Sequence, residues 1–249
     1  TFYTRLLSDN RLTRKLTKNM RLFISGSAPL LSETHEEFTK RTGHHILERY
    51  GMTETNMITS NPYHGERRPG TVGKSLADVQ MKITDPETGK EMAEGDVGMI
   101  EVRGPNVFKG YWNMPDKTAL ELRETGYFIT GDLGKLSSDG YLSIVGRHKD
   151  LIISGGYNVY PKEIEDILNE INQFSETAVF GIPDNDLGER VVSAIVLKNN
   201  KNFNQSKIEV FVNKKLARYK QPKEYFVLDA LPRNSMGKVQ KNELRKRFS

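Results

Sequence analysis

The sequence predicts a mixed α/β and α+β fold. The last part of a large α/β domain, with a β-rich subdomain, precedes a small α+β domain. Three observations support this prediction: a strand, glycine turn and helix pattern near the N-terminus, short apolar runs separated by turn residues in the middle, and alternating helix and strand patterns beyond residue 147. A length of 249 residues, 36% of them hydrophobic, allows one large or two smaller cores.

The first part of the chain has the element order of an α/β domain. Residues 21–26 form a short apolar run that ends at a glycine, which indicates a buried strand. A helix is expected over residues 32–41 and a second strand over residues 45–47.

The middle of the chain predicts the β-rich subdomain. Residues 79–83 alternate with a period of two, as a half-buried strand does. Residues 85–89 contain the aspartate, proline and glycine typical of a turn, and another strand is expected over residues 98–102.

A polar run at residues 146–150 separates two apolar stretches and marks the predicted domain boundary. We expect one domain over residues 1–147 and a second over residues 148–249. In the second domain, Pro161 suits the first turn of a helix, and apolar residues then recur at intervals of three and four. These residues are Ile164, Ile167, Leu168 and Ile171.

The rest of the second domain is predicted as strands around another helix. Ser206 and Glu209 have the spacing of a capping box at the start of that helix, and a loop over residues 232–238 leads to a short final helix. The apolar stripe of the middle helix comprises Ile208, Phe211, Val212 and Leu216. The strands are expected over residues 151–153, 177–182, 191–197 and 225–228.

Composition excludes several classes of protein. There is no cysteine, which rules out disulfides, thiolate nucleophiles and cysteine-bound zinc. The chain opens without a secretory signal, and no apolar run approaches the roughly 18 residues of a membrane helix, so we expect a cytoplasmic protein with no membrane partner. The net charge of +5 is typical of a solvated basic surface. A nucleic-acid partner is the weaker alternative, because it would require clustered basic residues with interleaved aromatics.

Five segments carry residues suited to binding phosphate, sugar or a flat ring. Ser27 and Ala28 follow the first strand, where small side chains and exposed N–H groups leave room for a flat ligand. Thr53 places a hydroxyl beside the carboxylate of Glu54, and this pair can bind a phosphate together with its Mg²⁺.

The other three segments lie further along the chain. Asp132 is flanked by glycines, which predicts a turn from which its carboxylate accepts ribose hydroxyls. Arg147 can hold ribose or phosphate oxygens, and Gly155 with Gly156 allows a thin ligand to pass close to the backbone. Lys238, on a glycine-containing loop, can reach a phosphate as a mobile charge. Each segment also has an ordinary structural alternative, such as a turn aspartate, a β-turn or a surface lysine.

The order and spacing of the five segments resemble the C-terminal motifs of the adenylate-forming superfamily, which includes acyl-CoA synthetases, luciferases and peptide-synthetase adenylation domains. The resemblance covers about residues 20–245. It implies an adenylation domain followed by a mobile lid, with ATP, Mg²⁺ and coenzyme A as ligands. The residues that it implies for ATP or AMP are Ser27, Ala28, Tyr50, Gly51, Met52, Thr53, Asp132, Arg147 and Lys238.

The same resemblance implies further roles. Thr53, Glu54 and Lys238 would be catalytic, with Glu54 on the metal. The hinge would lie at Lys149 or Asp150, and the coenzyme A tunnel would be lined by Gly155 and Gly156.

Within the superfamily the sequence is most similar to malonyl-CoA and methylmalonyl-CoA synthetases, over residues 47–57, 104–112 and 232–241. Arg49 stands where many relatives that use apolar acids have an uncharged residue. Its guanidinium fork suits the second carboxylate of malonate or methylmalonate, and Ser27 adds a neutral donor. The alternative is that Arg49 points to solvent or pairs with Glu48.

One expected feature is absent from the sequence. The superfamily uses a Ser/Thr/Gly-rich loop ending in lysine to wrap the β- and γ-phosphates, and no such loop occurs here. We therefore expect this chain to lack the N-terminal portion of the enzyme and to be inactive alone. A ligase for another short acid and a non-catalytic nucleotide-binding fragment remain as alternatives.

Overall fold

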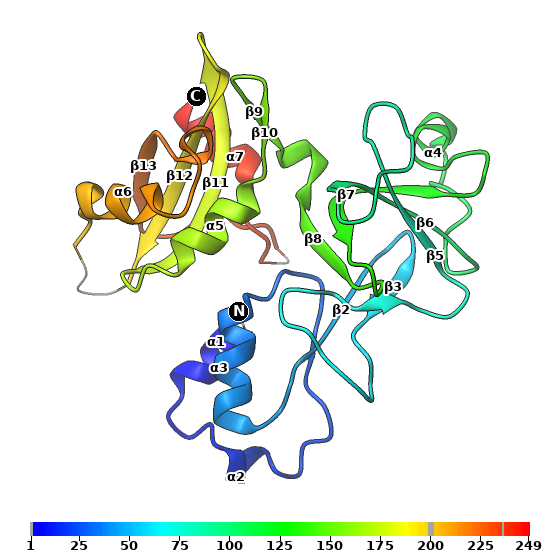
Figure 1. Ribbon diagram of the computed structural model, residues 1–249, viewed down its shortest axis with the longest axis horizontal. Helices are drawn as coiled ribbons and strands as arrows, with labels where there is room; N and C mark the ends of the chain where they lie inside the picture. Colours follow the sequence, from blue (N-terminus) through cyan, green and yellow to red (C-terminus); the bar gives the residue numbers. More distant parts are fainter. Residues whose placement is uncertain (1, 199–201, 236) are drawn as a thin grey trace. The chain divides into compact units, whose positions relative to one another are not determined.

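Three sheets form the framework of the part of the chain that the structure describes, residues 2–198, 202–235 and 237–249 (Figure 1). In this computed structural model the chain divides into two units, Thr1–Ile144 and Val145–Ser249. Two four-stranded sheets belong to the first unit, except for the end of one strand, and a five-stranded sheet belongs to the second. The predicted mixed α/β and α+β fold is confirmed.

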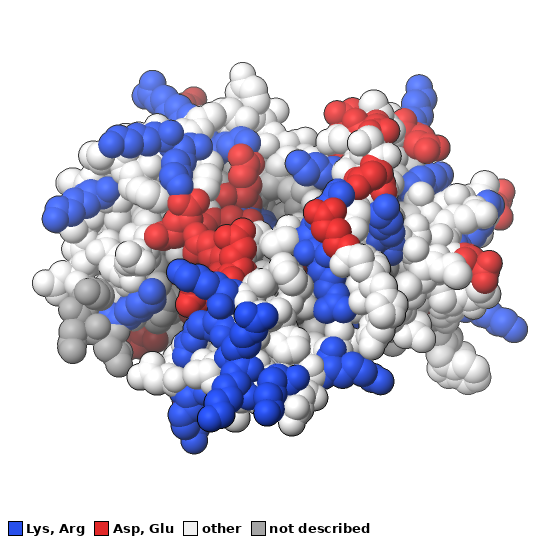
Figure 2. Space-filling view, turned by 60° about the horizontal axis from the view of Figure 1, so that its bottom comes forward, with Lys and Arg blue, Asp and Glu red and all other residues white. Residues whose placement is uncertain are grey.

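Helices open the first unit. They are α1 (Phe2–Ser8), α2 (Arg14–Thr17) and α3 (Ser32–Thr42). α3 buries Phe38 completely, with the rings of Tyr3 and Phe23 centred 5.1 and 4.9 Å from it. Figure 2 shows lysine and arginine side chains gathered where these helices lie, and much of the positive charge of the chain is therefore solvated.

The first sheet has the order β1-β2-β3-β4. Its strands are β1 (Ile24–Ser25), β2 (Leu47–Met52), β3 (Asn56–Ser60) and β4 (Lys74–Ser75). β1 is much shorter than the predicted strand over residues 21–26, because only two of its residues find partners on β2. β2 extends five residues beyond the predicted strand end at Leu47, because β3 folds back on it as an antiparallel partner.

The second sheet is antiparallel in the order β5-β6-β7-β8, with α4 (Pro115–Glu121) in the connection before β7. Its strands are β5 (Gln80–Thr84), β6 (Gly98–Arg103), β7 (Phe128–Leu136) and β8 (Leu142–Arg147). The predicted strands over residues 79–83 and 98–102 are confirmed, and one face of the sheet forms a core. The fully buried members of this core are Ile58, Ile100, Val102, Phe128 and Leu142.

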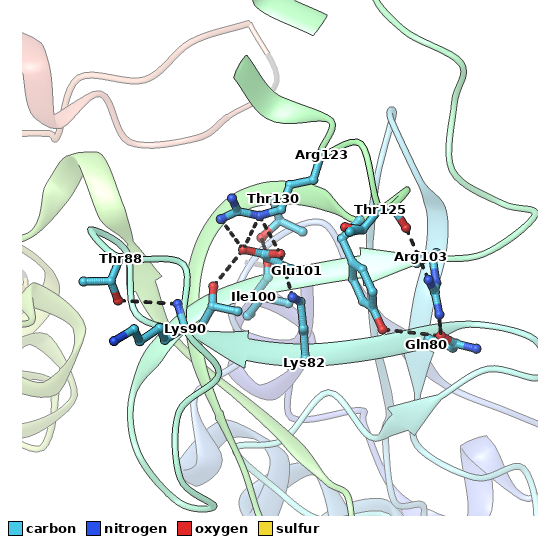
Figure 3. Close-up of polar contacts among 12 residues, drawn as sticks. Gln80, Lys82, Thr88, Lys90, Ile100, Glu101, Arg103, Arg123, Thr125 and Thr130 are labelled. Carbon is cyan, nitrogen blue, oxygen red and sulfur yellow. Dashed lines mark hydrogen bonds and ion pairs between the residues drawn. The ribbon is translucent and has the colours of Figure 1, made fainter. Parts of the chain in front are cut away.

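A buried carboxylate joins two strands of this sheet, β5 and β6, to the loop before β7 (Figure 3). Glu101 is fully buried on β6, and Arg123 donates to both of its oxygens at 2.6–2.9 Å. The Thr84 hydroxyl donates to it at 2.8 Å, and the Lys82 ammonium lies 3.4 Å away. Burial raises the pKa of Glu101, but the hydrogen bonds from Arg123 and Thr84 outweigh burial and hold the pKa below its ordinary value.

The second unit packs helices on both faces of one sheet. Its helices are η1 (His148–Asp150), α5 (Pro161–Asn169), α6 (Gln205–Asn213), η2 (Arg218–Lys220) and α7 (Lys241–Phe248). Its strands are β9 (Ile152–Ser154), β10 (Tyr157–Val159), β11 (Phe174–Asp184), β12 (Gly188–Leu197) and β13 (Glu224–Leu228).

Strand alternation sends neighbouring residues of β11 into different cores. Val179 joins Ile164 and Leu168 in the core beneath α5 and α6, so the predicted stripe of α5 is confirmed. Phe180 faces the opposite side, where it packs with Leu244 of α7. None of the helices in the described ranges combines the length and apolar character needed to cross a membrane.

The predicted capping box of α6 is wrong. The helix begins at Gln205, so Ser206 and Glu209 lie inside it. Its N-cap is Asn204, whose side chain accepts a 3.1 Å hydrogen bond from the Lys207 backbone N–H. Asparagine fills this position as well as serine does, and the cap therefore forms two residues earlier. Leu216 is buried as expected, although it lies beyond the helix end.

Candidate functional site

Ser27 and Ala28 lie in the exposed loop after β1, beside β2. The two strands run parallel, so their carboxyl ends meet at one edge of the sheet. A Cβ added to Gly26 would lie 3.4 Å from both Cγ and the carbonyl oxygen of Arg49. The Arg49 side chain therefore crosses the Gly26 backbone, next to Ser27.

Arg49 and Glu48 are neighbours in β2, and side chains alternate along a strand. Glu48 is buried, and its Oε1 lies 3.1 Å from Nδ1 of His35. The Arg49 side chain is exposed and makes no hydrogen bond or ion pair with any other residue that the structure describes. The alternative that Arg49 pairs with Glu48 is therefore excluded, and the guanidinium is accessible.

Tyr50 and Asp132 come from different sheets and meet in the first unit. The Tyr50 hydroxyl donates a 2.5 Å hydrogen bond to Oδ2 of Asp132. Both are nearly inaccessible, with 9% and 5% of their surface exposed. The expectation that Asp132 lies on a turn is wrong, because Asp132 is part of β7, and its flanking glycines lie in that strand as well.

Thr53 and Glu54 lie in the three-residue loop that joins β2 to β3, with Gly51 and Met52 at the end of β2. The Thr53 side chain is exposed and the Glu54 side chain is half-buried. At Gly51 the two strands approach so closely that a Cβ would lie 2.0 Å from the Asn56 carbonyl oxygen. The tight hairpin thus requires glycine and places the hydroxyl and the carboxylate at its tip.

A loop over residues 104–114 holds this hairpin tip, although the sequence had suggested no role for its residues. The Phe108 N–H donates to the Glu54 carbonyl oxygen at 2.8 Å. The Asn106 side-chain amide donates to the carbonyl oxygens of Thr55 and Met57 at 2.7 and 3.2 Å. Backbone groups that would otherwise need water are satisfied by this loop, which fixes the tip.

Tyr111, from the same loop, lies between two carboxylates. Its hydroxyl oxygen is 2.6 Å from Oε2 of Glu121 and 3.1 Å from Oε1 of Glu54. Burial raises the pKa of Tyr111 far above its ordinary value of 10.0, and the hydrogen bonds to Glu121 and Glu54 raise it further. The phenol stays protonated, and it can donate its single proton to only one carboxylate at a time. The shorter contact assigns that proton to Glu121, so the Glu54 carboxylate can still bind another ligand.

The carboxylate of Glu54 suits a magnesium ion that is shared with a phosphate. Mg²⁺ usually takes one or two protein carboxylates and completes its shell with phosphate oxygens and water. Within the described ranges, no three His, Asp or Glu side chains form a complete metal site. Glu54 and Glu121, which both contact the Tyr111 hydroxyl, are the carboxylates at this tip that could contribute to such a shell.

The polar run after the second sheet forms a short helix. Arg147 is the exposed last residue of β8, and Lys149 lies exposed within η1. Oδ1 of Asp150 lies 3.4 Å from Nη1 of Arg245 on α7. The predicted hinge segment is thus one 3₁₀ turn whose last residue is tied to the second unit.

Gly155 and Gly156 form the two-residue turn of the β9–β10 hairpin, in which Ser154 pairs with Tyr157. Their φ angles are +57° and +79°, and both glycines are exposed. The Tyr157 ring stacks on that of Tyr219 at 4.7 Å. The turn therefore exposes backbone without side chains next to the stacked rings of Tyr157 and Tyr219.

The Lys238 loop is held by its own hydrogen bonds. Oδ1 of Asn234 accepts from the Lys238 N–H at 2.9 Å, and the Gly237 N–H donates to the Asn234 carbonyl oxygen at 2.9 Å. Arg233 anchors the loop to Glu176 of β11 at 2.6 Å. The Lys238 ammonium is exposed and makes no ion pair or hydrogen bond with the described residues, so it remains available to an anion.

The structure therefore gathers the predicted residues into two groups. One lies in the first unit and comprises Ser27, Ala28, Arg49, Tyr50, Gly51, Met52, Thr53, Glu54 and Asp132. The other lies in the second unit and comprises Arg147, Lys149, Asp150, Gly155, Gly156 and Lys238.

Two family models match the chain. The model for the AMP-binding enzyme matches residues 1–112, and the model for the AMP-binding enzyme C-terminal domain matches residues 163–238. Together they contain most of the predicted site residues.

Curated relatives and solved structures match nearly all of this chain. Malonate–CoA ligase of Arabidopsis thaliana is 40% identical over 99% of this chain and 43% of its own, and a long-chain-fatty-acid–CoA ligase of Bacillus subtilis is 38% identical over 98% and 44%. The crystal structure of ATP-bound MatB from Rhodopseudomonas palustris is 56% identical, with a TM-score of 0.96 over 99% of this chain and 49% of that one. The chain thus spans about half the length of these relatives.

Proposed function

The chain belongs to the AMP-binding enzyme family, and we propose that it is part of an ATP-dependent acid–CoA ligase that works through an acyl-AMP intermediate. The observation that carries the proposal is the contact of Tyr50 with Asp132 beside the hairpin tip that holds Thr53 and Glu54. This arrangement supports the proposal, because a flat ring, a carboxylate suited to ribose and a hydroxyl–carboxylate pair suited to phosphate lie on adjoining elements of one unit.

In the first half-reaction, a carboxylate oxygen of the acid attacks the α-phosphorus of ATP. The bond to the bridging oxygen of the β-phosphate breaks, and pyrophosphate leaves. Lys238 would stabilise the negative charge that builds on the transferred group, because its ammonium is exposed and makes no ion pair with the described residues. The Thr53 hydroxyl and the Glu54 carboxylate orient the phosphates, and no protein nucleophile is needed.

For the nucleotide we propose the binding residues that the family resemblance implies. The backbone of Ser27 and Ala28 and the strand end Tyr50–Gly51–Met52 border the purine, while Asp132 and Arg147 hold the ribose hydroxyls. Glu54 would hold Mg²⁺ together with the phosphates. When bound, Mg²⁺ neutralises phosphate charge.

In the second half-reaction, the sulfur of coenzyme A attacks the acyl carbon of the mixed anhydride. The thiol proton is lost, and AMP leaves with the electron pair of the broken bond. We assign residues 1–147 to the end of the adenylation domain and residues 148–249 to a lid. Rotation at Lys149 and Asp150 would withdraw Lys238 and bring Gly155 and Gly156 to the pantetheine arm.

We propose malonate or methylmalonate as the acid. Relatives of similar identity are named for malonate and for long-chain fatty acids, so overall similarity does not select the substrate. The choice rests on Arg49, an accessible guanidinium without an ion-pair partner among the described residues, beside Ser27. A second carboxylate would give this charge its partner. The alternative is a ligase for another short acid.

We also propose a cytoplasmic location for the enzyme. Its small-molecule partners there would be malonate or methylmalonate, ATP and coenzyme A.

The test is malonate-dependent release of pyrophosphate, followed by thioester formation, in the full-length protein. The 249-residue chain alone should bind nucleotide without turnover, because it lacks a triphosphate-binding loop. Pyrophosphate release that does not depend on any carboxylic acid would contradict the ligase assignment. Robust turnover by the chain alone would show that the triphosphate is bound without that loop.

A further inference from the structure

Asp132 lies in a part of β7 where the pairing with β6 is irregular. In the β6–β7 ladder Met99 pairs with Leu133 and Glu101 pairs with Ile129. Only Ile100 lies between the two β6 residues, whereas three residues, 130–132, lie between their partners. The two extra residues of β7 form a bulge, and such bulges turn side chains away from the regular alternation of a sheet.

Gly131 sits at the centre of this bulge with φ of +73°. A Cβ at this position would meet no atom within 4 Å, so only the backbone conformation favours glycine there. Gly131 lets the chain make the bulge, but it does not hold the bulge closed.

The Thr130 hydroxyl closes the bulge (Figure 3). It donates to the Ile100 carbonyl oxygen at 2.9 Å and accepts from the Asp132 N–H at 3.1 Å. Thr130 is 4% exposed, so no water would replace these bonds readily. One side chain therefore ties the backbone of Asp132 to the single β6 residue that lies opposite the bulge.

We propose that Thr130 is a positioning residue for ribose recognition: its hydroxyl holds the β7 bulge that points the Asp132 carboxylate at the ribose hydroxyls of the nucleotide. Thr130 does not touch the nucleotide and acts only through Asp132. The proposal rests on the proposed function, because it assumes that Asp132 binds ribose.

Two substitutions separate the hydroxyl from the rest of the side chain. Thr130→Val keeps the branched shape and removes both hydrogen bonds, which leaves the Ile100 carbonyl and the Asp132 N–H buried without this partner. Thr130→Ser keeps the hydroxyl and removes one methyl group. A positioning role requires the serine variant to behave like the wild type and the valine variant to behave differently.

The readout is discrimination between ATP and 2′,3′-dideoxy-ATP, measured as two dissociation constants by calorimetry in the full-length protein. The wild type should prefer ATP by about tenfold or more, since the analogue lacks the two hydroxyls that would donate to the Asp132 carboxylate. Thr130→Val should lose most of that preference, chiefly because it binds ATP more weakly. Its ratio of the two dissociation constants should approach that of Asp132→Asn. Thr130→Ser should keep it.

The outcomes distinguish this inference from the proposed function. If Asp132→Asn keeps the preference for ATP, the ribose role of Asp132 fails. If Asp132→Asn loses the preference while Thr130→Val retains it, only the inference about Thr130 is overturned. Should thermal melting show that Thr130→Val does not fold, Thr130→Ala replaces it, since this change also removes the hydroxyl that makes both hydrogen bonds. An unchanged preference in that variant equally overturns the inference.

Discussion

The Tyr50 hydroxyl donates a 2.5 Å hydrogen bond to Asp132, although 82 residues separate the two along the chain. The contact joins β2 of the first sheet to β7 of the second. A buried carboxylate keeps its charge only when hydrogen-bond donors compensate for lost water, and the phenol is one such donor. The same bond restricts the rotation of both side chains, so the proposed purine-binding and ribose-binding groups are positioned together.

We expect Tyr50→Phe to weaken nucleotide binding roughly tenfold, the scale for a lost hydrogen bond to a charged group. The aromatic ring, which we propose borders the purine, remains, so the loss measures the contribution of the hydroxyl alone. Titration of AMP by calorimetry checks this. Tyr127→Phe is the matched control and should leave affinity unchanged, because the Tyr127 hydroxyl donates to Gln80 on the second sheet and to no other described residue. A lower melting temperature with unaltered affinity would assign Tyr50 to the fold instead.

Local patterns predicted the elements whose residues interact within a few positions of each other. The stripe of α5 formed by Ile164, Ile167 and Leu168 is an example, because one turn of helix decides which side chains share a face. The glycines around Asp132 suggested a turn for the same local reason. Pairing with β6, whose residues lie some 30 positions away, made that segment a bulged strand instead.

The contacts between the loop over residues 104–114 and the β2–β3 hairpin tip could not be predicted from local sequence patterns. Asn106 reaches Thr55 across 51 residues, and Tyr111 reaches Glu54 across 57. Neither separation leaves a periodic signal in the sequence. One available signal was missed at Arg49: adjacent residues of a strand point to opposite faces, which argues against a pair with Glu48 once residue 49 is placed in a strand.

Lys238→Ala should lower the rate of adenylation by about 10²-fold or more, the scale for removing one preorganised group from a transition state. Conversion of supplied malonyl-AMP and coenzyme A to thioester should change far less, because the proposed lid rotation has then withdrawn Lys238. Separate rapid-quench measurements of the two half-reactions test this. Lys246→Ala, which removes another exposed cation of the second unit, serves as the control. Equal losses in both half-reactions would remove the assigned role.

Arg123→Met should lower the free energy of unfolding by about 3–5 kcal/mol, because it leaves the fully buried Glu101 carboxylate without its bidentate partner. Glu101→Gln should lower the free energy of unfolding by less than Arg123→Met does, because the partly exposed Arg123 side chain can turn to water. Urea denaturation at neutral pH compares the two variants. A larger loss from Glu101→Gln would show that the ion pair itself contributes more than the cost of an unpaired carboxylate.

The same network predicts a pH dependence. The pKa of Glu101 in the folded protein lies below its ordinary value of 4.5, so the unfolded chain takes up a proton first as pH falls. The stabilisation is therefore complete above about pH 4.5 and is lost as pH drops through the folded pKa. Glu101→Gln should flatten the fall in stability below that pH, and an unchanged slope would show that other carboxylates dominate.

Arg49 provides the test of the substrate. Its side chain crosses Gly26 beside Ser27, where the free carboxylate of a bound diacid would need a charged partner. Arg49→Ala should lower kcat/KM for malonate by an amount equivalent to about 2–5 kcal/mol, and Arg49→Lys should recover part of it, because lysine restores the charge without the fork. Propionate, which lacks the second carboxylate, should be used nearly as well as before, and Lys40→Ala controls for the loss of an exposed cation from this unit. Specificity is a difference of two transition-state energies, so both acids must be measured with one preparation of each variant. If kcat/KM falls by the same factor for malonate and for propionate, Arg49 supports the nucleotide or the fold. The proposal of a diacid substrate then loses its physical basis.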